Sequence, residues 1–283
     1  MENQSLQDFL EEKKKRIDTA LVDSLAEIKE KSSLYAAISY SIFSGGKRIR
    51  PILLLAACEG LHIEEEKALL PAIALEMIHT YSLIHDDLPC MDNSSTRRGK
   101  PTVHTLYGED VALLAGDALL THAFSLLSSE KSKSHFPTST LLRLIQELAQ
   151  KSGVFGMVEG QAFELLQQHN SLSEDILHYI DEHKTAALFS AALSMAGIMA
   201  ESDETTLKQY SQIGRLFGHA FQIADDIQDL ETDHDKTNYA QLHGIEFSRQ
   251  KIREYLQKAT DLMRSLPIQN TRISELFTLL EKI

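Results

Sequence analysis

The 283-residue chain has no tryptophan, two cysteines, 6 prolines and 13 glycines, and these shortages exclude several kinds of protein. Cys58 and Cys90 are too few for a disulfide framework, and neither belongs to a metal-binding Cys-x-x-Cys pair. The scarcity of proline and glycine leaves few of the breakers that a many-stranded protein needs at its turns. The formal net charge of −13 argues against a nucleic-acid-binding protein, whose surface would carry a basic patch.

Two further absences concern membranes and export. The chain has no uninterrupted run of about 18 apolar residues, which predicts that no segment spans a membrane. Its first residues, Met1 to Gln4, lead into a charged segment rather than an apolar one, so no signal peptide is expected. We therefore expect a cytoplasmic protein that reaches any lipid-like substrate from water.

Apolar residues recur at helical spacing along almost the whole chain. No alternating pattern is long enough to build a sheet, and no linker rich in Pro, Gly or Ser divides the chain. These features predict an all-α protein with one domain over residues 1–283. The expected helices are 4–29, 32–43, 48–60, 65–88, 106–128, 137–151, 153–168, 173–199, 203–231, 246–265 and 271–282.

Asp86, Asp87 and Asp92 form a carboxylate cluster after an apolar helical run from Leu69 to Ile84. Carboxylates at the C-terminal end of a helix oppose its macrodipole, and a bound cation removes that electrostatic cost. Hard oxygen ligands favour Mg²⁺ over zinc. Taken alone, however, the cluster is equally consistent with an exposed helix end.

A second cluster, Asp225, Asp226 and Asp229, lies at the C-terminal end of another expected helix. Asp225 and Asp229 are four residues apart, so they share one helix face. Two such clusters in a chain of buried helices favour a magnesium site over two exposed helix ends. Magnesium held by so few carboxylates completes its coordination with substrate phosphates and water.

Two cationic segments could supply the phosphate-binding part of such a site. Residues 44–51 form a glycine turn followed by three cations, and residues 96–102 add three more just beyond Asp92. Arginine binds phosphate oxygens bidentately, and lysine adds a point charge. Alone, the glycine turn could be a helix cap with basic neighbours. His79 could help to bind phosphate or could be a buried core histidine. Beside carboxylates in an acidic protein, the cations favour a metal–diphosphate site.

Several segments resemble motifs of the trans-prenyl diphosphate synthases, those of bacteria that make farnesyl diphosphate especially. They occur in family order: Gly45–Pro51, Tyr81–Asp92, Arg97–Thr102, Gly156–Gln161, Lys184–Phe189 and Phe221–Asp229. The resemblance implies a single large bundle of mostly antiparallel helices, usually paired as a homodimer. In that family both carboxylate clusters face a central cavity.

The resemblance also implies a role for each matched residue. The magnesium site would comprise Asp86, Asp87, Asp92, Asp225, Asp226 and Asp229, with three ions expected when substrate is bound. Isopentenyl diphosphate would be bound by Lys47, Arg50, His79 and Arg98. The allylic diphosphate would be bound by Arg97, Lys184, Thr185, Gln222 and Lys236, of which Lys184, Thr185 and Gln222 are the expected catalytic residues. Product length would be set by Tyr81, with Ser82 beside it.

The implied reaction joins isopentenyl diphosphate to dimethylallyl or geranyl diphosphate and releases diphosphate, giving farnesyl diphosphate. Metal ions and cationic side chains stabilise the departing allylic diphosphate, and the double bond of isopentenyl diphosphate attacks the allylic cation. The departing diphosphate takes the proton that is lost. So reactive a cation needs a dry cavity, which helices lined with Leu, Ile, Phe and Ala can provide.

Two departures from the family pattern leave alternatives open. Asn93, Ser94 and Ser95 stand where relatives often carry more acidic residues. Leu230–Asp235 leads directly into Lys236, so a glycine-and-lysine loop with one phosphate-binding lysine is missing. The shortened loop favours a non-catalytic subunit that modulates a true synthase, and a C20 geranylgeranyl diphosphate synthase is a second alternative. A terpene cyclase would have no use for the cations of both segments. We expect the reaction type to persist with lower efficiency.

Overall fold

The structure is a computed structural model that describes residues 5–167, 173–230, 238–268 and 271–281. The chain divides into two compact units. Unit 1 comprises residues 1–55 and 65–141, and unit 2 comprises residues 56–64 and 142–283. Two of the three boundaries fall within helices, α4 (Ile49–Gly60) and α9 (Thr138–Ser152), and the third lies just before Glu65. The expectation of one domain over the whole chain stays a prediction.

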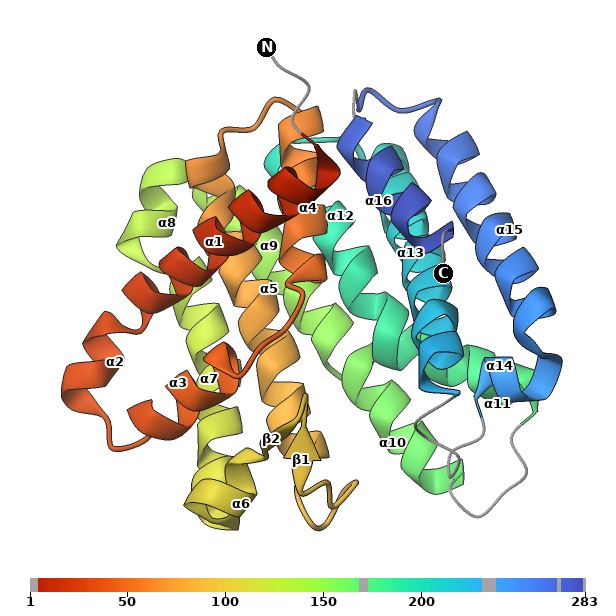
Figure 1. The fold of residues 1–283 in the computed structure, drawn as a ribbon. Coiled ribbons are helices and arrows are strands. Elements are labelled where there is room, and N and C mark those ends of the chain that lie inside the picture. The colour runs from red at the N-terminus through yellow and green to blue at the C-terminus, as the bar shows by residue number, and fades with distance from the viewer. Residues whose placement is uncertain (1–4, 168–172, 231–237, 269–270, 282–283) are drawn as a thin grey trace. The chain divides into compact units, whose positions relative to one another are not determined.

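Unit 1 is built around helix α5 (Glu65–Asp86), whose side chains from Ala68 to Ile84 are mostly buried. The other elements of this unit are α1 (Leu6–Ser24), α2 (Ala26–Lys31), α3 (Tyr35–Phe43), β1 (Thr96–Arg97), β2 (Lys100–Pro101), α6 (Val103–Tyr107), α7 (Glu109–Leu127) and α8 (Glu130–His135). Helices α1, α3, α7 and α8 pack against α5 (Figure 1). Helix α5 is therefore held by contacts with four neighbouring helices.

Unit 2 is built around α12 and α13. Its elements are α10 (Met157–Gln167), α11 (Glu174–Ile180), the π-helix η1 (Asp181–Ala186), α12 (Ala187–Met199), α13 (Glu204–Asp229), α14 (Tyr239–His243), α15 (Ile245–Met263) and α16 (Thr271–Glu281). Every residue of α12 is buried. Helix α13 packs against α12 and α15 (Figure 1). It begins at Asp203, whose carboxylate accepts hydrogen bonds from the N–H groups of Thr205 and Thr206.

The all-α prediction is confirmed, because the strands of the described residues are only the two-residue pair β1 and β2. Three expected helices are nevertheless interrupted. The expected helix 4–29 is divided at Leu25, and 106–128 is divided at Gly108, whose φ of 93° is left-handed. The expected helix 173–199 contains the π-helical turn η1. Helices α8 and α14 were not expected from the sequence.

Two helical stretches are long and apolar enough to cross a membrane by length and composition alone, although each contains charged residues. In Glu65–Asp86, 78% of the relevant window is buried inside the protein, as expected for a core helix. In Glu109–His135 only 33% is buried. Apolar side chains of α7, among them Leu113 and Leu114, are therefore exposed in the part of the chain that the structure describes.

Candidate active site

The first carboxylate cluster lies at the C-terminal end of α5. Pro89 disfavours helical backbone at Leu88, and the helix ends at Asp86. The chain then turns back, and the N–H of Asp92 donates to the carbonyl oxygen of Asp86 over 2.9 Å. The turn joins Asp86 and Asp92, two of the predicted magnesium ligands, through their backbones.

Asp87 differs from its neighbours because it is buried, with 4% of its surface exposed. Its two carboxylate oxygens accept hydrogen bonds from Nε of Arg97 over 2.9 and 3.0 Å. Nη2 of Arg97 lies 2.7 Å from Oδ1 of the same carboxylate. Arg97 thus contacts both oxygens of Asp87, so this carboxylate orients the arginine within the predicted metal cluster.

Arg98, which follows Arg97 in the chain, lies in the hairpin turn between β1 and β2 and contacts the glycine loop. Arg98 and Gly99 are the two turn residues, and both have positive φ angles, 54° and 72°. This two-residue turn matches the twist of a hairpin, and glycine adopts it without strain. Nη1 of Arg98 donates to the carbonyl oxygen of Gly45, so the hairpin contacts the glycine loop before α4. Gly46 has a φ of 127°, a backbone conformation that favours glycine, which explains the second glycine.

The glycine loop is anchored by Arg48, a role that was not predicted from the sequence. Its Nη1 donates to Oε1 of Glu76 on α5 over 2.8 Å, and its Nε donates to Oδ1 of Asp18 on α1 over 2.9 Å. Nη2 donates to the carbonyl oxygen of Ile42. The Arg48 and Glu76 side chains are each 3% exposed. Burial raises the pKa of Glu76, although the charges of nearby arginines oppose this shift. The only sequence signal was the position of Glu76, three residues before His79 on α5.

The predicted isopentenyl diphosphate residues lie around this anchor. Nη1 of Arg50 is 3.5 Å from Nε2 of His79. Burial lowers the pKa of His79 well below its usual value, and Arg50 and Arg98 lower it further. His79 is therefore neutral near pH 7 and can accept a hydrogen bond from an arginine. Lys47 is exposed on the same loop.

Tyr81, the predicted chain-length residue, is buried on α5 with its ring edge against His85, at a centroid distance of 5.7 Å. Burial raises the pKa of its hydroxyl to about 12. Ser82 donates its hydroxyl hydrogen bond to the carbonyl oxygen of His79. Nε2 of His85 lies 3.0 Å from the carbonyl oxygen of Leu113, and Gly116 leaves the space for its ring. Helix α7 thus packs closely beside the segment that carries Tyr81.

The second carboxylate cluster occupies the last turn of α13 in unit 2. Asp226 is 7% exposed and accepts hydrogen bonds from Nε2 of Gln222 over 2.8 Å and from the N–H of Tyr239 over 3.0 Å. Like Asp87, it is therefore occupied by protein groups. Asp225 is half-buried and Asp229 is exposed at the helix end. The predicted ligand Lys236 and the shortened loop 231–237 lie outside the described residues.

The predicted allylic residues Lys184 and Thr185 lie in η1. Thr185 donates from Oγ1 to Oε1 of Gln222 over 2.8 Å, and Lys184 forms an ion pair with Glu164 of α10. Thr185, Gln222 and Asp226 thus form one hydrogen-bonded chain. Burial raises the pKa of Asp181 well above its usual value, and the carboxylates of Asp226 and Glu164 raise it further. Glu164 and Asp181 were not predicted from the sequence, where neither belongs to a recognisable pattern.

The carboxylates of the two clusters suit a metal ion that shares its coordination with substrate. Within the described residues, no group of three or more His, Cys, Asp or Glu side chains is arranged to hold a metal by itself. Magnesium is usually bound by one or two carboxylates together with substrate phosphates and water. The carboxylates of Asp86, Asp92, Asp225 and Asp229 at two helix ends fit that kind of binding, whereas zinc would call for a more complete cage.

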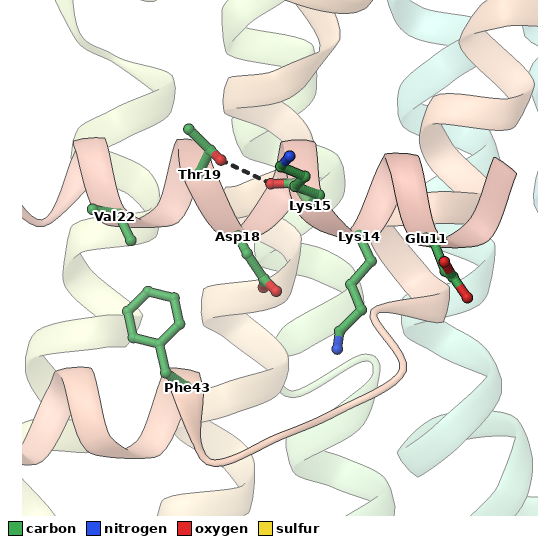
Figure 2. Close-up of a pocket in the computed structure, with 7 residues that line it drawn as sticks. All are labelled: Glu11, Lys14, Lys15, Asp18, Thr19, Val22 and Phe43. Atoms are coloured by element: carbon green, nitrogen blue, oxygen red, sulfur yellow. Dashed lines mark hydrogen bonds between the residues drawn. The ribbon is translucent and has the colours of Figure 1, made fainter. Parts of the chain in front are cut away.

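A groove on the surface of unit 1 lies away from these residues. Its volume is 480 Å³, and Figure 2 shows its lining by α1 side chains and Phe43 of α3. The lining residues are Glu11, Lys14, Lys15, Asp18, Thr19, Val22 and Phe43. Two lysines and two carboxylates line it together, so the groove lacks the concentrated positive charge of a diphosphate site. Asp18 connects it to Arg48.

An all-helical chain with two carboxylate-bearing helix ends, each accompanied by arginine or lysine, defines a class of diphosphate-processing enzyme. A sequence model of the family described as polyprenyl synthetase matches residues 31–243. The chain belongs to the polyprenyl synthetase family.

Individual relatives agree with this assignment. The chain is 36% identical over 283 residues to a farnesyl diphosphate synthase of Geobacillus stearothermophilus, covering 95% of each chain. It is 41% identical over 235 residues to a geranylgeranyl diphosphate synthase of Cyanophora paradoxa, covering 83% of this chain and 77% of that one. Among solved structures, an FPP/GFPP synthase from Zymomonas mobilis superposes with a TM-score of 0.86 at 34% identity, covering 98% of both chains.

Proposed function

We propose that the chain condenses isopentenyl diphosphate with dimethylallyl or geranyl diphosphate to give farnesyl diphosphate and diphosphate. The observation that carries this function is the duplication of the site chemistry. Each unit has its own carboxylate-bearing helix end and its own cations, which together supply the metal ligands and phosphate-binding groups for two diphosphate substrates. The farnesyl diphosphate synthase relatives support the same reaction.

Magnesium would be held by Asp86 and Asp92 in unit 1 and by Asp225 and Asp229 in unit 2. When bound, it would neutralise negative charge on the diphosphate groups. Three ions are proposed with substrate bound. Asp87 and Asp226 would complete this metal site, and they also hold Arg97 and Gln222 through their carboxylate oxygens.

The protein groups act on the two substrates separately. Arg97, Lys184, Thr185, Gln222 and Lys236 would bind the allylic diphosphate, and they stabilise it most as it departs with increasing charge. Lys47, Arg50, His79 and Arg98 would bind isopentenyl diphosphate. The bond from the allylic carbon to diphosphate breaks, and the double bond of isopentenyl diphosphate forms the new carbon–carbon bond. The proton lost from the product would pass to the released diphosphate.

The product is proposed to be the C15 chain because Tyr81 is bulky and buried. It lies five residues before Asp86, about 7.5 Å toward the N-terminus of α5 at ~1.5 Å per residue. A tail that starts at the carboxylate end and runs along α5 would meet this ring. A C20 product is the second candidate, favoured by the geranylgeranyl diphosphate synthases among the relatives.

A homodimer is proposed from the uncovered face of α7. Leu113 and Leu114 on this helix are 47% and 52% exposed, although the stretch has the hydropathy of a core helix. Large exposed apolar patches mark interaction surfaces. Light scattering after size-exclusion chromatography should give twice the chain mass of 31.8 kDa. Leu114→Asp should shift the mass toward the monomer, and an unchanged dimer would place the interface elsewhere.

A product assay tests the function directly. Purified protein would receive isopentenyl diphosphate, dimethylallyl or geranyl diphosphate, and Mg²⁺, and the dephosphorylated alcohols would be separated by chromatography. A C15 alcohol is expected, and a C20 alcohol would favour the second candidate. No product from protein that is folded by circular dichroism would contradict the catalytic proposal and favour a modulating subunit.

A further inference from the structure

The π-helix η1 carries Lys184 and Thr185, two residues that the proposed function assigns to the allylic diphosphate. π-Helical turns are rare and are found frequently at functional sites. Helices α10, α11, α12 and α13 all pack against η1. The contacts made by α10 and α13 identify the groups that fix its position.

Both helices approach η1 through a glycine. An alanine Cβ at Gly160 of α10 would lie 2.3 Å from the backbone nitrogen of Lys184. An alanine Cβ at Gly218 of α13 would lie 2.5 Å from Cα of Ala186. These neighbours are backbone atoms, which cannot rotate away as a long side chain can. The two helices therefore contact η1 at a distance that only glycine permits.

Each glycine is followed, four residues later, by a side chain that holds η1. Glu164 follows Gly160 and forms the ion pair with Lys184. Gln222 follows Gly218 and accepts the hydrogen bond from Thr185 over 2.8 Å. Residues four apart lie on one helix face. Helices α10 and α13 thus use the same arrangement, a glycine for close approach and a polar partner one turn further along.

We propose that Gly160, Glu164 and Gly218 are positioning residues that fix η1 between α10 and α13, and so set Lys184 and Thr185 for the allylic diphosphate. This inference rests on the proposed function. None of the three residues needs to touch substrate. They act through the backbone position of η1 and through the lysine that Glu164 orients.

The size of the effect follows from the distances. Ordinary contact begins at 3.4 Å, so a Cβ at Gly160 requires the backbone at Lys184 to move by about 1 Å. A displacement of about 1 Å can lower a rate by about 100-fold, because reacting groups lose their alignment. We expect Gly160→Ala and Gly218→Ala to lower kcat/KM for the allylic substrate by roughly 10- to 100-fold.

Two other glycines of unit 2 provide matched controls. An alanine Cβ at Gly197 would lie 2.6 Å from the buried Tyr210 ring, so it crowds side chains rather than backbone, away from η1. At Gly214 it would lie 2.4 Å from the carbonyl oxygen of Phe189, just beyond the end of η1. The expected order of the catalytic effect is Gly160 and Gly218 first, then Gly214, then Gly197. A merely structural role would instead make the loss follow the fall in Tm.

Calorimetric binding measures the positioning directly. The probes are an unreactive thiolo analogue of geranyl diphosphate with Mg²⁺ and, separately, isopentenyl diphosphate. Gly160→Ala and Gly218→Ala should weaken binding of the analogue at least about 10-fold and change binding of isopentenyl diphosphate less than about 2-fold. Unchanged analogue binding in a folded variant, or equal weakening in Gly197→Ala, would overturn the proposal.

Two further measurements cover the cases in which a variant does not fold or the protein forms no product. If neither glycine variant folds, Glu164→Gln decides the question, because it preserves volume but removes the ion pair with Lys184. Unchanged analogue binding in that variant would also overturn the proposal. If the wild-type protein forms no prenyl product, the proposed function fails. The positioning role is then decided by whether Gly160→Ala weakens binding of magnesium diphosphate.

Discussion

The two units hold their cationic residues in different ways. In unit 1, Arg48 forms a buried ion pair with Glu76 and anchors a loop in which Gly45, Gly46 and Arg48 all have positive φ. In unit 2, Lys184 and Thr185 lie within a helix whose backbone is in direct contact with two neighbouring helices. The first arrangement depends on electrostatics and turn geometry, and the second depends on close packing. Substitutions that neutralise a charge should therefore impair the protein more when they are made in unit 1. Substitutions that add volume should impair it more when they are made in unit 2.

Substitutions in the two carboxylate clusters should cause the largest losses of activity, and these losses should be similar in unit 1 and unit 2. We expect Asp86→Ala and Asp225→Ala each to lower kcat about 1000-fold or more, because each removes a proposed ligand of the magnesium that would stabilise the departing diphosphate. Product formation and circular dichroism would be measured together. Near-normal turnover in either folded variant would show that its unit does not hold a metal.

A substitution that changes the length of the product is expected in unit 1, at Tyr81. Tyr81→Ala removes a buried ring, and we expect the main product to shift from C15 to C20 or longer. Ser82→Ala is the matched control, because the Ser82 hydroxyl hydrogen-bonds to its own helix. Chromatography of the dephosphorylated alcohols measures the product length of both variants. Persistence of the C15 product in Tyr81→Ala would remove Tyr81 from the floor of the pocket.

Neutralising a charge should lower the free energy of unfolding more in unit 1 than in unit 2. Glu76→Gln leaves Arg48 without its buried partner and should lower the free energy of unfolding by about 3–5 kcal/mol. Glu164→Gln affects a pair that is 24% and 29% exposed, so a loss of about 1 kcal/mol or less is expected. Urea denaturation measures both. Equal losses would contradict the distinction between an electrostatic and a steric arrangement.

The smallest expected effect is a change of stability with pH, which arises from His79 in unit 1. The pKa of His79 is lowered in the folded protein, so the unfolded chain binds a proton more readily below its usual pKa of about 6.5. Stability should fall as pH decreases below this value, by at most about 1.4 kcal/mol per pH unit for one histidine. His79→Gln should remove this part of the slope in urea denaturation between about pH 5 and 7.5. An unchanged slope would show that His79 does not contribute.

The helices and both carboxylate clusters were accessible from the sequence because they depend on local patterns. Apolar spacing indicated the α5 and α13 regions, and the position of Pro89 indicated where α5 stops. The charged segments were equally visible, since their residues are adjacent in the chain. The matched motifs indicate one family for the same reason, because each is a contiguous run of residues.

The partners of those residues could not be predicted because they come from distant parts of the chain. Asp18 and Glu76 reach Arg48 only after α1, α4 and α5 have folded. Glu164 reaches Lys184 across 20 residues. The π-helical turn was missed for a similar reason, since its residues are ordinary helix formers and its geometry depends on packing against Gly160 and Gly218.

The ion pair between Lys184 and Glu164 also bears on how quickly substrate is captured. Because Glu164 holds Lys184 before substrate arrives, the lysine needs little rearrangement of its side chain when a diphosphate group binds. We expect this preorganisation to raise the rate at which the allylic diphosphate is captured. A chain that lacked this carboxylate would capture the diphosphate more slowly.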